Sequence, residues 1–175
     1  MSGSHEGERA AYRISVVCTG NICRSPMGEW LLREAFEDAG LDVDVSSAGT
    51  SAEESGNPMD SRTIAVLRRN GHVDRGWGGH RAARFTADDF ADVDLVLAAD
   101  RGHERQLLRL ARTDEDRAKV RLLRSFDPRS SAAEDLEMDD PWWGDDASFD
   151  QTYAEVVAAV PGVVERVRDE LGATA

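Results

Sequence analysis

Cysteine is scarce in this sequence, which contains two residues of this type, Cys18 and Cys23, in 175 positions. Domains that depend on a disulfide framework carry many more cysteines, so the composition excludes a disulfide scaffold. A structural zinc site needs several protein ligands, and no histidine lies near this pair in the sequence. The two cysteines are therefore expected to matter through their reactivity or their packing.

Long apolar runs are absent as well. No stretch approaches the roughly 20 apolar residues of a membrane-spanning helix. The first residues are polar and acidic, whereas a secretory signal begins with positive charge and continues with an apolar stretch. The formal net charge of -13 disfavours a nucleic-acid or anionic-membrane partner. We therefore expect a cytoplasmic protein without such partners, while the sequence does not decide whether it is also secreted by an unconventional route.

The pattern of apolar residues alternates between strands and helices along a chain whose length fits one domain. We expect strands at residues 12–17, 43–47, 95–98 and 120–123, and helices at 25–40, 59–70, 104–111 and 149–171. Pro161 should kink or divide the last helix. Residues 50–58 and 127–148 have the composition of loops. This order predicts an α/β fold with a single domain at 12–175, preceded by a flexible N-terminus at 1–11.

In such a fold, a four-stranded parallel sheet is flanked by helices on both faces, and ligands bind at the carboxyl ends of the strands. The segment 18–25 leaves the first strand at that end and enters the first helix, with Ser25 as its expected N-cap and Pro26 at its first position. Gly20 and Asn21 tolerate the backbone angles of a tight curl. The backbone N–H groups of such a loop can surround a tetrahedral oxyanion. The expected phosphate-binding residues are Thr19, Gly20, Asn21, Ile22, Cys23, Arg24 and Ser25.

Three side chains of this loop suit phosphoryl transfer. The positive environment should stabilise Cys18 as a thiolate, which is the nucleophilic form of cysteine. Arg24 offers a planar set of donors that can bind two phosphoryl oxygens. The Ser25 hydroxyl is a candidate donor to the Cys18 sulfur. Cys23 either protects Cys18 by a reversible disulfide or simply packs under the loop.

The residues 17–27, VCTGNICRSPM, resemble the signature of low-molecular-weight protein tyrosine phosphatases. Further matches occur at SAGT (47–50), RLLRSFDP (121–128) and DPWWG (140–144), so the resemblance extends over about residues 14–171. It implies a cysteine-dependent phosphatase that forms a phosphocysteine intermediate and needs no metal or cofactor. Its partner would be a phosphotyrosine-containing protein, a kinase or a kinase substrate, and the enzyme would be a monomer or associate weakly with itself.

A general acid is expected to protonate the leaving oxygen of the ester. Asp140 is the best candidate, because Pro141 holds it extended and the adjacent tryptophans would shield its carboxyl group from water. Its neighbour Asp139 lacks the proline. In the family this motif is Asp-Pro-Tyr-Tyr and its aspartate is the general acid, a role that the resemblance assigns to Asp140.

The walls of the expected cleft and the residues that support its loop are less conspicuous in the sequence. Trp142 can stack on a phenyl ring, whereas Trp143 either contacts substrate or anchors its loop. Glu53 occupies a position where relatives often carry an aromatic residue. Ser47 and His80 resemble family positions that hydrogen-bond with the loop asparagine and support the strained curl. Purely structural roles are expected for His72, His103 and Asp100.

The sequence suggests three alternative functions. In protein-arginine phosphatases, similar sequences carry a small polar residue at the position of Ile22, whose apolar side chain suits a phenyl ring better than a guanidinium. Arsenate reductases with this loop use further cysteines later in the chain, and none follows Cys23. A non-catalytic phosphopeptide-binding module would have lost Cys18 or Asp140, and both are present.

Overall fold

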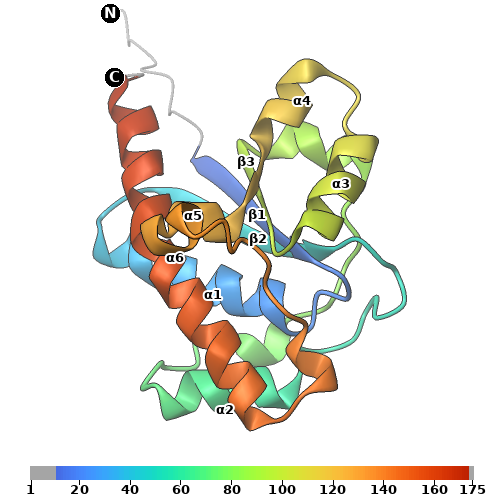
Figure 1. Ribbon diagram of the computed structural model, residues 1–175, viewed down its shortest axis with the longest axis vertical. Helices are drawn as coiled ribbons and strands as arrows, with labels where there is room; N and C mark the ends of the chain where they lie inside the picture. The colour runs from blue at the N-terminus through green and yellow to red at the C-terminus, as the bar shows by residue number, and fades with distance from the viewer. Residues whose placement is uncertain (1–10, 174–175) are drawn as a thin grey trace, which may run out of the picture.

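Four parallel strands form the sheet at the centre of the computed structural model, which describes residues 11–173 (Figure 1). The strands are β1 (Tyr12–Cys18), β2 (Val43–Gly49), β3 (Leu95–Ala98) and β4 (Val120–Leu122), in the spatial order β2-β1-β3-β4. All neighbouring pairs are parallel, as the alternation of strands and helices predicted. The predicted flexible N-terminus lies outside the described residues except for Ala11.

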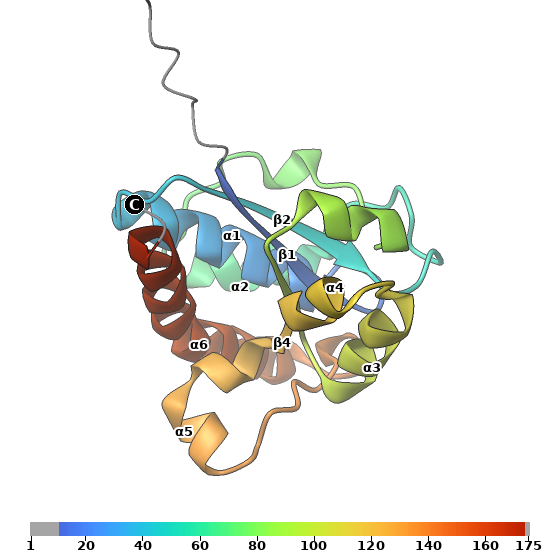
Figure 2. The same cartoon turned by 90° about the horizontal axis from the view of Figure 1, so that it is seen from above.

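Helices cover both faces of this sheet (Figure 2). The helices α1 (Arg24–Asp38), α2 (Ser61–Arg69) and α6 (Asp146–Ala173) pack on one face, where Ile14 and Val16 of β1 enter their core. The other face is covered by α3 (Arg101–Leu110) and a 3₁₀ helix, Ala87–Asp92, which pack around Val17. Successive side chains of a strand point to opposite faces, so buried β1 contributes to both cores.

Several boundaries differ from the sequence-based expectation. The helix α1 begins at Arg24 with Cys23 as its N-cap, so Ser25 is not the capping residue that was predicted. The stretch 127–148, expected to be a loop, contains α5 (Pro128–Ala132) and a 3₁₀ helix, Pro141–Trp143. Asp127 and Asp140 each cap one of these short helices with a carboxylate oxygen. The short helix α4 (Asp114–Lys119) was not predicted, because it buries no residue and so has no apolar periodicity.

The last helix, α6, runs through Pro161 without being divided, contrary to one of the expected outcomes. The reason lies in the packing around the next residue. A Cβ atom on Gly162 would lie 2.1 Å from the carbonyl oxygen of Phe126, so α6 approaches that backbone more closely than any larger residue would allow. Buried residues on both sides of the proline, including Ala159 and Val163, also pack into the core and keep the helix continuous.

Within residues 11–173, no helix combines the length and apolar character needed to cross a membrane.

Candidate active site

The loop between β1 and α1 turns its carbonyl groups outward. The carbonyl oxygens of Cys18, Thr19, Ile22 and Cys23 accept hydrogen bonds from the backbone N–H groups of Thr50, Ser51, Asp60 and Met27, respectively. Among the described residues, the N–H groups of positions 20–23 have no hydrogen-bond partner. Since the carbonyls are bound from outside, these N–H groups are left for an anion at the centre of the loop.

Asn21 holds the curl of the loop in place. Its backbone is in the left-handed region with φ of 59°, as the sequence suggested. The Nδ2 group donates to Ser47 Oγ at 2.9 Å, and Oδ1 accepts from the N–H of Ala83 at 3.0 Å. His80 Nε2 lies 2.7 Å from the Asn21 carbonyl oxygen and donates to it. Both predicted support residues, Ser47 and His80, therefore contact the asparagine directly.

The predicted nucleophile, Cys18, is buried at the base of the loop with 3% of its surface exposed. Its Sγ lies 3.1 Å from Ser25 Oγ, and Asn21 Nδ2 donates to the same hydroxyl oxygen at 2.8 Å. Because Ser25 Oγ already accepts a hydrogen bond from Asn21 Nδ2, its own hydroxyl hydrogen is free to point at the sulfur. The arrangement can therefore stabilise a thiolate by a charge-assisted hydrogen bond.

The guanidinium of Arg24 is buried and bound from behind. Its Nη1 donates to the Met138 carbonyl oxygen at 2.8 Å and to Asp100 Oδ2 at 3.2 Å. Its Nη2 lies 3.4 Å from Thr19 Oγ1, whereas Nε has no partner among the described residues. A buried donor without a partner is costly, so the Nε and Nη2 edge is suited to bind two oxygens of an oxyanion.

The candidate acid Asp140 reaches the same site from the loop before α6. Its Oδ2 lies 3.6 Å from Arg24 Nη2, and Oδ1 accepts from the N–H of Trp142 at 3.1 Å. About a third of the side chain, 34%, is exposed, so the tryptophans enclose it less than expected. Asp139 is exposed and does not line the cleft. The structure thus places Asp140, and not Asp139, beside the phosphate loop.

A cleft of about 290 Å³ opens above the loop. Trp142 and Trp143 form one wall and meet edge to face, with ring centroids 4.5 Å apart. Trp143 is 81% exposed, so it does not anchor its loop to the core. Glu53 lies on the lining as predicted, beside Ser51 and Glu54, which the sequence did not indicate because polar residues of a loop have no distinguishing pattern.

Cys23 also borders the cleft, but its thiol points toward α2. Its Sγ lies 3.7 Å from Asp60 Oδ2, and both cysteines are free thiols. Burial raises the pKa of Cys23, and the negative charge of Asp60 raises it further. The Asp60 carboxylate also binds Arg62, whose Nη1 reaches the Trp142 carbonyl oxygen at 3.3 Å. The sequence missed this link between α2 and the tryptophan wall, because it joins residues far apart in the chain.

The two histidines expected to be structural have different surroundings. His72 bridges α1 and α6 through Glu34 and the Tyr153 hydroxyl, each at 2.8 Å, which agrees with that expectation. His103 instead lies beside the phosphate loop, with Nε2 2.7 Å from Thr19 Oγ1. Asp100 likewise contacts Arg24, so both residues are closer to the site than expected.

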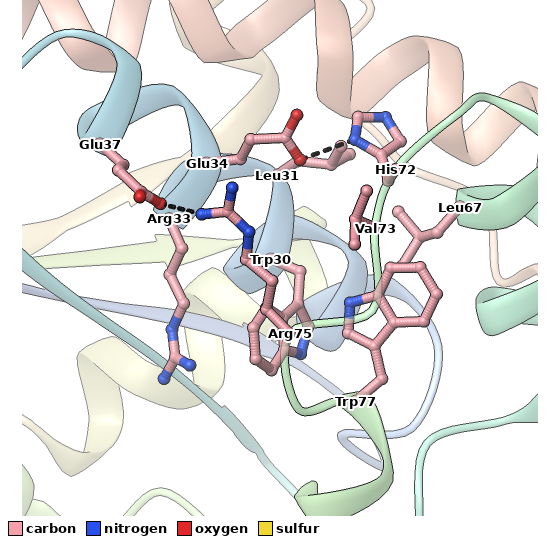
Figure 3. A pocket seen from close by; sticks show the side chains of 10 residues that line it. All are labelled: Trp30, Leu31, Arg33, Glu34, Glu37, Leu67, His72, Val73, Arg75 and Trp77. Carbon is pink, nitrogen blue, oxygen red and sulfur yellow. Dashed lines mark hydrogen bonds and ion pairs between the residues drawn. The ribbon is translucent and has the colours of Figure 1, made fainter.

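A second cavity, of about 120 Å³, lies between α1 and the segment 72–77 (Figure 3). Its walls include Trp30 and Trp77, and the hydrogen bond between His72 and Glu34 lies beside it. No residue of the phosphate loop lines this cavity. The segment continues into His80, so its attachment to α1 helps to position the histidine that binds Asn21.

Comparison with known proteins agrees with this arrangement. The family model described as low molecular weight phosphotyrosine protein phosphatase matches residues 13–173. The low molecular weight protein-tyrosine-phosphatase of Streptomyces coelicolor is 47% identical over 163 residues, covering 91% of this chain and 96% of that protein. The low molecular weight protein-tyrosine phosphatase A of Mycobacterium bovis is 40% identical over 160 residues, covering 90% and 93%.

A solved structure of a Vibrio vulnificus protein in complex with benzylphosphonate has a TM-score of 0.75 and 29% identity, covering 90% of this chain and 99% of that one. The α/β fold and the resemblance inferred from the sequence are thereby confirmed, as is the expectation of a cysteine-dependent phosphatase. The chain belongs to the low molecular weight phosphotyrosine protein phosphatase family.

Proposed function

We propose that the protein hydrolyses phosphotyrosine in proteins, with Cys18 as nucleophile, Arg24 as phosphate ligand and Asp140 as general acid and base. The observation that carries this proposal is the convergence of the three side chains at one cleft, with Ser25 Oγ 3.1 Å from the sulfur and Asp140 3.6 Å from the guanidinium. Each group matches one requirement of phosphate ester cleavage.

In the first step, the Cys18 thiolate attacks phosphorus and the bond to the phenolic oxygen breaks. Asp140 gives its proton to that oxygen, so the leaving group departs as a neutral tyrosine side chain. The N–H groups of the loop and the Nε and Nη2 edge of Arg24 bind the phosphoryl oxygens as charge redistributes.

In the second step, a water molecule attacks the phosphocysteine. Asp140, now a carboxylate, accepts a proton from this water as the sulfur–phosphorus bond breaks. Inorganic phosphate is released and Cys18 returns as a thiolate, which the Ser25 hydroxyl stabilises. The cycle restores both catalytic groups to their starting protonation states.

The lining of the cleft supports an aryl ester as substrate. Ile22 and Trp142 both line it, and 43% of Trp142 is exposed, so a phenyl ring can lie against its indole. The related Vibrio vulnificus protein binds benzylphosphonate, which carries a phenyl ring next to a phosphonate group. A guanidinium phosphate would gain less from these apolar surfaces, so we expect phosphotyrosine peptides to be preferred over phosphoarginine peptides.

Turnover of p-nitrophenyl phosphate near pH 6 tests the proposal. Cys18→Ser should lose all turnover yet still bind inorganic phosphate, because the loop and Arg24 remain. Asp140→Asn should lose about 10²- to 10⁴-fold in turnover, the typical contribution of general acid catalysis. Equal turnover by the three proteins would refute the enzyme mechanism, and faster hydrolysis of a phosphoarginine peptide would refute the substrate assignment.

A further inference from the structure

Four polar residues close a ring behind the phosphate loop. Thr19 Oγ1 lies 2.7 Å from His103 Nε2, and His103 Nδ1 lies 3.0 Å from Asp100 Oδ1. The other oxygen of Asp100 accepts from Arg24 Nη1 at 3.2 Å, and Arg24 Nη2 returns to Thr19 Oγ1 at 3.4 Å. His103 is 3% exposed, so its imidazole is largely withdrawn from water, whereas Thr19 is exposed.

The direction of each proton in the ring follows from the donors that it contains. A guanidinium only donates, so Thr19 Oγ1 accepts from Arg24. The Asp100 carboxylate only accepts, so a neutral imidazole carries its proton on Nδ1, which faces that carboxylate. His103 Nε2 then accepts the hydrogen bond that the Thr19 hydroxyl donates. The Nδ1–Oδ1 contact has the distance of an ion pair but not the angle of a hydrogen bond, so its contribution is mainly electrostatic.

The Asp100 carboxyl group is ionised, as a partner for the protonated Nδ1 of His103 and for Arg24 should be. Burial tends to raise the pKa of Asp100, but the backbone N–H and the imidazole of His103, together with the positive charge of Arg24, outweigh burial and bring it to about 2. The group is therefore a carboxylate at neutral pH. Asp100 also caps α3 by accepting from the N–H of His103 at 2.9 Å, which fixes the start of the helix against the loop.

The ring restrains one edge of Arg24 and leaves the other for ligand. Asp100 and the Met138 carbonyl oxygen hold Nη1, and Thr19 holds Nη2 from the side. The side chain is only 4% exposed, and its Nε is a buried donor without a partner among the described residues. Preorganised donors cost no reorganisation during the reaction, so the orientation of this edge before phosphate arrives should increase the rate.

We propose that Thr19, His103 and Asp100 are positioning residues that orient the Arg24 guanidinium for the phosphoryl group. This inference rests on the proposed role of Arg24 in phosphate binding. It assigns to the Thr19 side chain a function beyond that of its backbone N–H group. It also gives His103 a function that a helix-capping contact alone would not require.

The hydroxyl of Thr19 provides the sharpest test, because Thr19→Val removes it and the matched Thr19→Ser keeps it. Thr19 is exposed, so neither change should unfold the protein. We expect Thr19→Val to lower kcat/KM for p-nitrophenyl phosphate by about 3- to 10-fold, the value of one ordinary hydrogen bond, and Thr19→Ser to stay within about 2-fold. Thermal unfolding of all three proteins should agree closely, which separates positioning from stability.

His103 is tested by a second pair. Gln can place an amide oxygen near the position of Nε2, so His103→Gln should retain more activity than His103→Leu. In the double variant Thr19→Val with His103→Leu, the loss should be close to that of the larger single change, since both break the same ring. Losses that multiply, or equal losses for Thr19→Val and Thr19→Ser, would overturn the proposal.

Binding of inorganic phosphate separates failure of this inference from failure of the proposed function. In the Cys18→Ser background, titration calorimetry should show weaker phosphate binding when Thr19→Val is added, whether or not the wild-type protein turns over substrate. If Thr19→Val changed neither phosphate affinity nor turnover, the positioning role of the ring would be refuted and the proposed function would stand. An inactive wild-type protein would overturn the proposed function, and the phosphate titration would still decide on the ring.

Discussion

Replacing Asp100 by Asn should reveal how much this partly buried charge contributes to folding. The pKa of this carboxyl group falls from its ordinary value of 3.8 to about 2, despite burial, because His103 and Arg24 favour the ionised form. A pKa shift of one unit corresponds to about 1.4 kcal/mol of free energy between the two protonation states. Since 22% of the side chain is exposed and solvent screens the charge, we expect Asp100→Asn to lower the free energy of unfolding by about 1 to 2 kcal/mol.

The sign of the pH dependence follows from the lowered pKa. The unfolded chain binds a proton at Asp100 more readily than the folded protein does, so the stabilisation is complete above about pH 4 and disappears as the pH falls toward about 2. Urea unfolding of both proteins should therefore give a constant difference between pH 7 and pH 5. Below about pH 4 the difference should shrink.

The control for this experiment is Asp88→Asn, at an exposed carboxylate that pairs with Arg112 at 2.7 Å. Surface pairs of this kind contribute little, so the change in unfolding free energy should stay within about 0.5 kcal/mol. A destabilisation by Asp100→Asn that persists unchanged to the lowest accessible pH would refute the electrostatic reasoning. It would indicate that the loss comes from shape or from the helix cap.

Three further changes test other parts of the site. Ser25→Ala should reduce turnover of p-nitrophenyl phosphate by about 10-fold or more, because the Cys18 sulfur loses a charge-assisted hydrogen bond. Ser25→Thr keeps the hydroxyl and should retain most activity. Gly49→Ala should destabilise the protein by about 1 to 3 kcal/mol, because the new Cβ would lie 2.5 Å from a carbonyl oxygen of the phosphate loop. Gly78→Ala is the matched control in thermal unfolding, because a Cβ there meets no atom within 4 Å. Trp142→Ala should lower kcat/KM for phenyl phosphate by about 5-fold through lost ring contact, while inhibition by inorganic phosphate stays the same. An unchanged kcat/KM would contradict stacking.

The order of strands and helices could be predicted because each element carries its own periodic pattern. Leu95–Ala98 has the predicted bounds of β3, since all of its residues are apolar and turn residues follow. The helix at 114–119 could not be predicted in this way, because it buries no residue. Ser25 was wrongly predicted to be the N-cap of α1, because a serine before a proline usually caps a helix. Its hydroxyl instead contacts the Cys18 sulfur, and that contact is visible only in the folded protein.

The sequence by itself determined the chemistry of the phosphate loop, because Cys18, Asn21, Arg24 and Ser25 lie within one short segment whose spacing sets their geometry. Only the tertiary structure decided which distant groups meet that loop. Asp140, His80 and His103 arrive from separate elements, and the contacts that bring them there depend on how parallel strands and their helices pack. No local pattern records such contacts, so the ring behind Arg24 becomes visible only when the chain is folded.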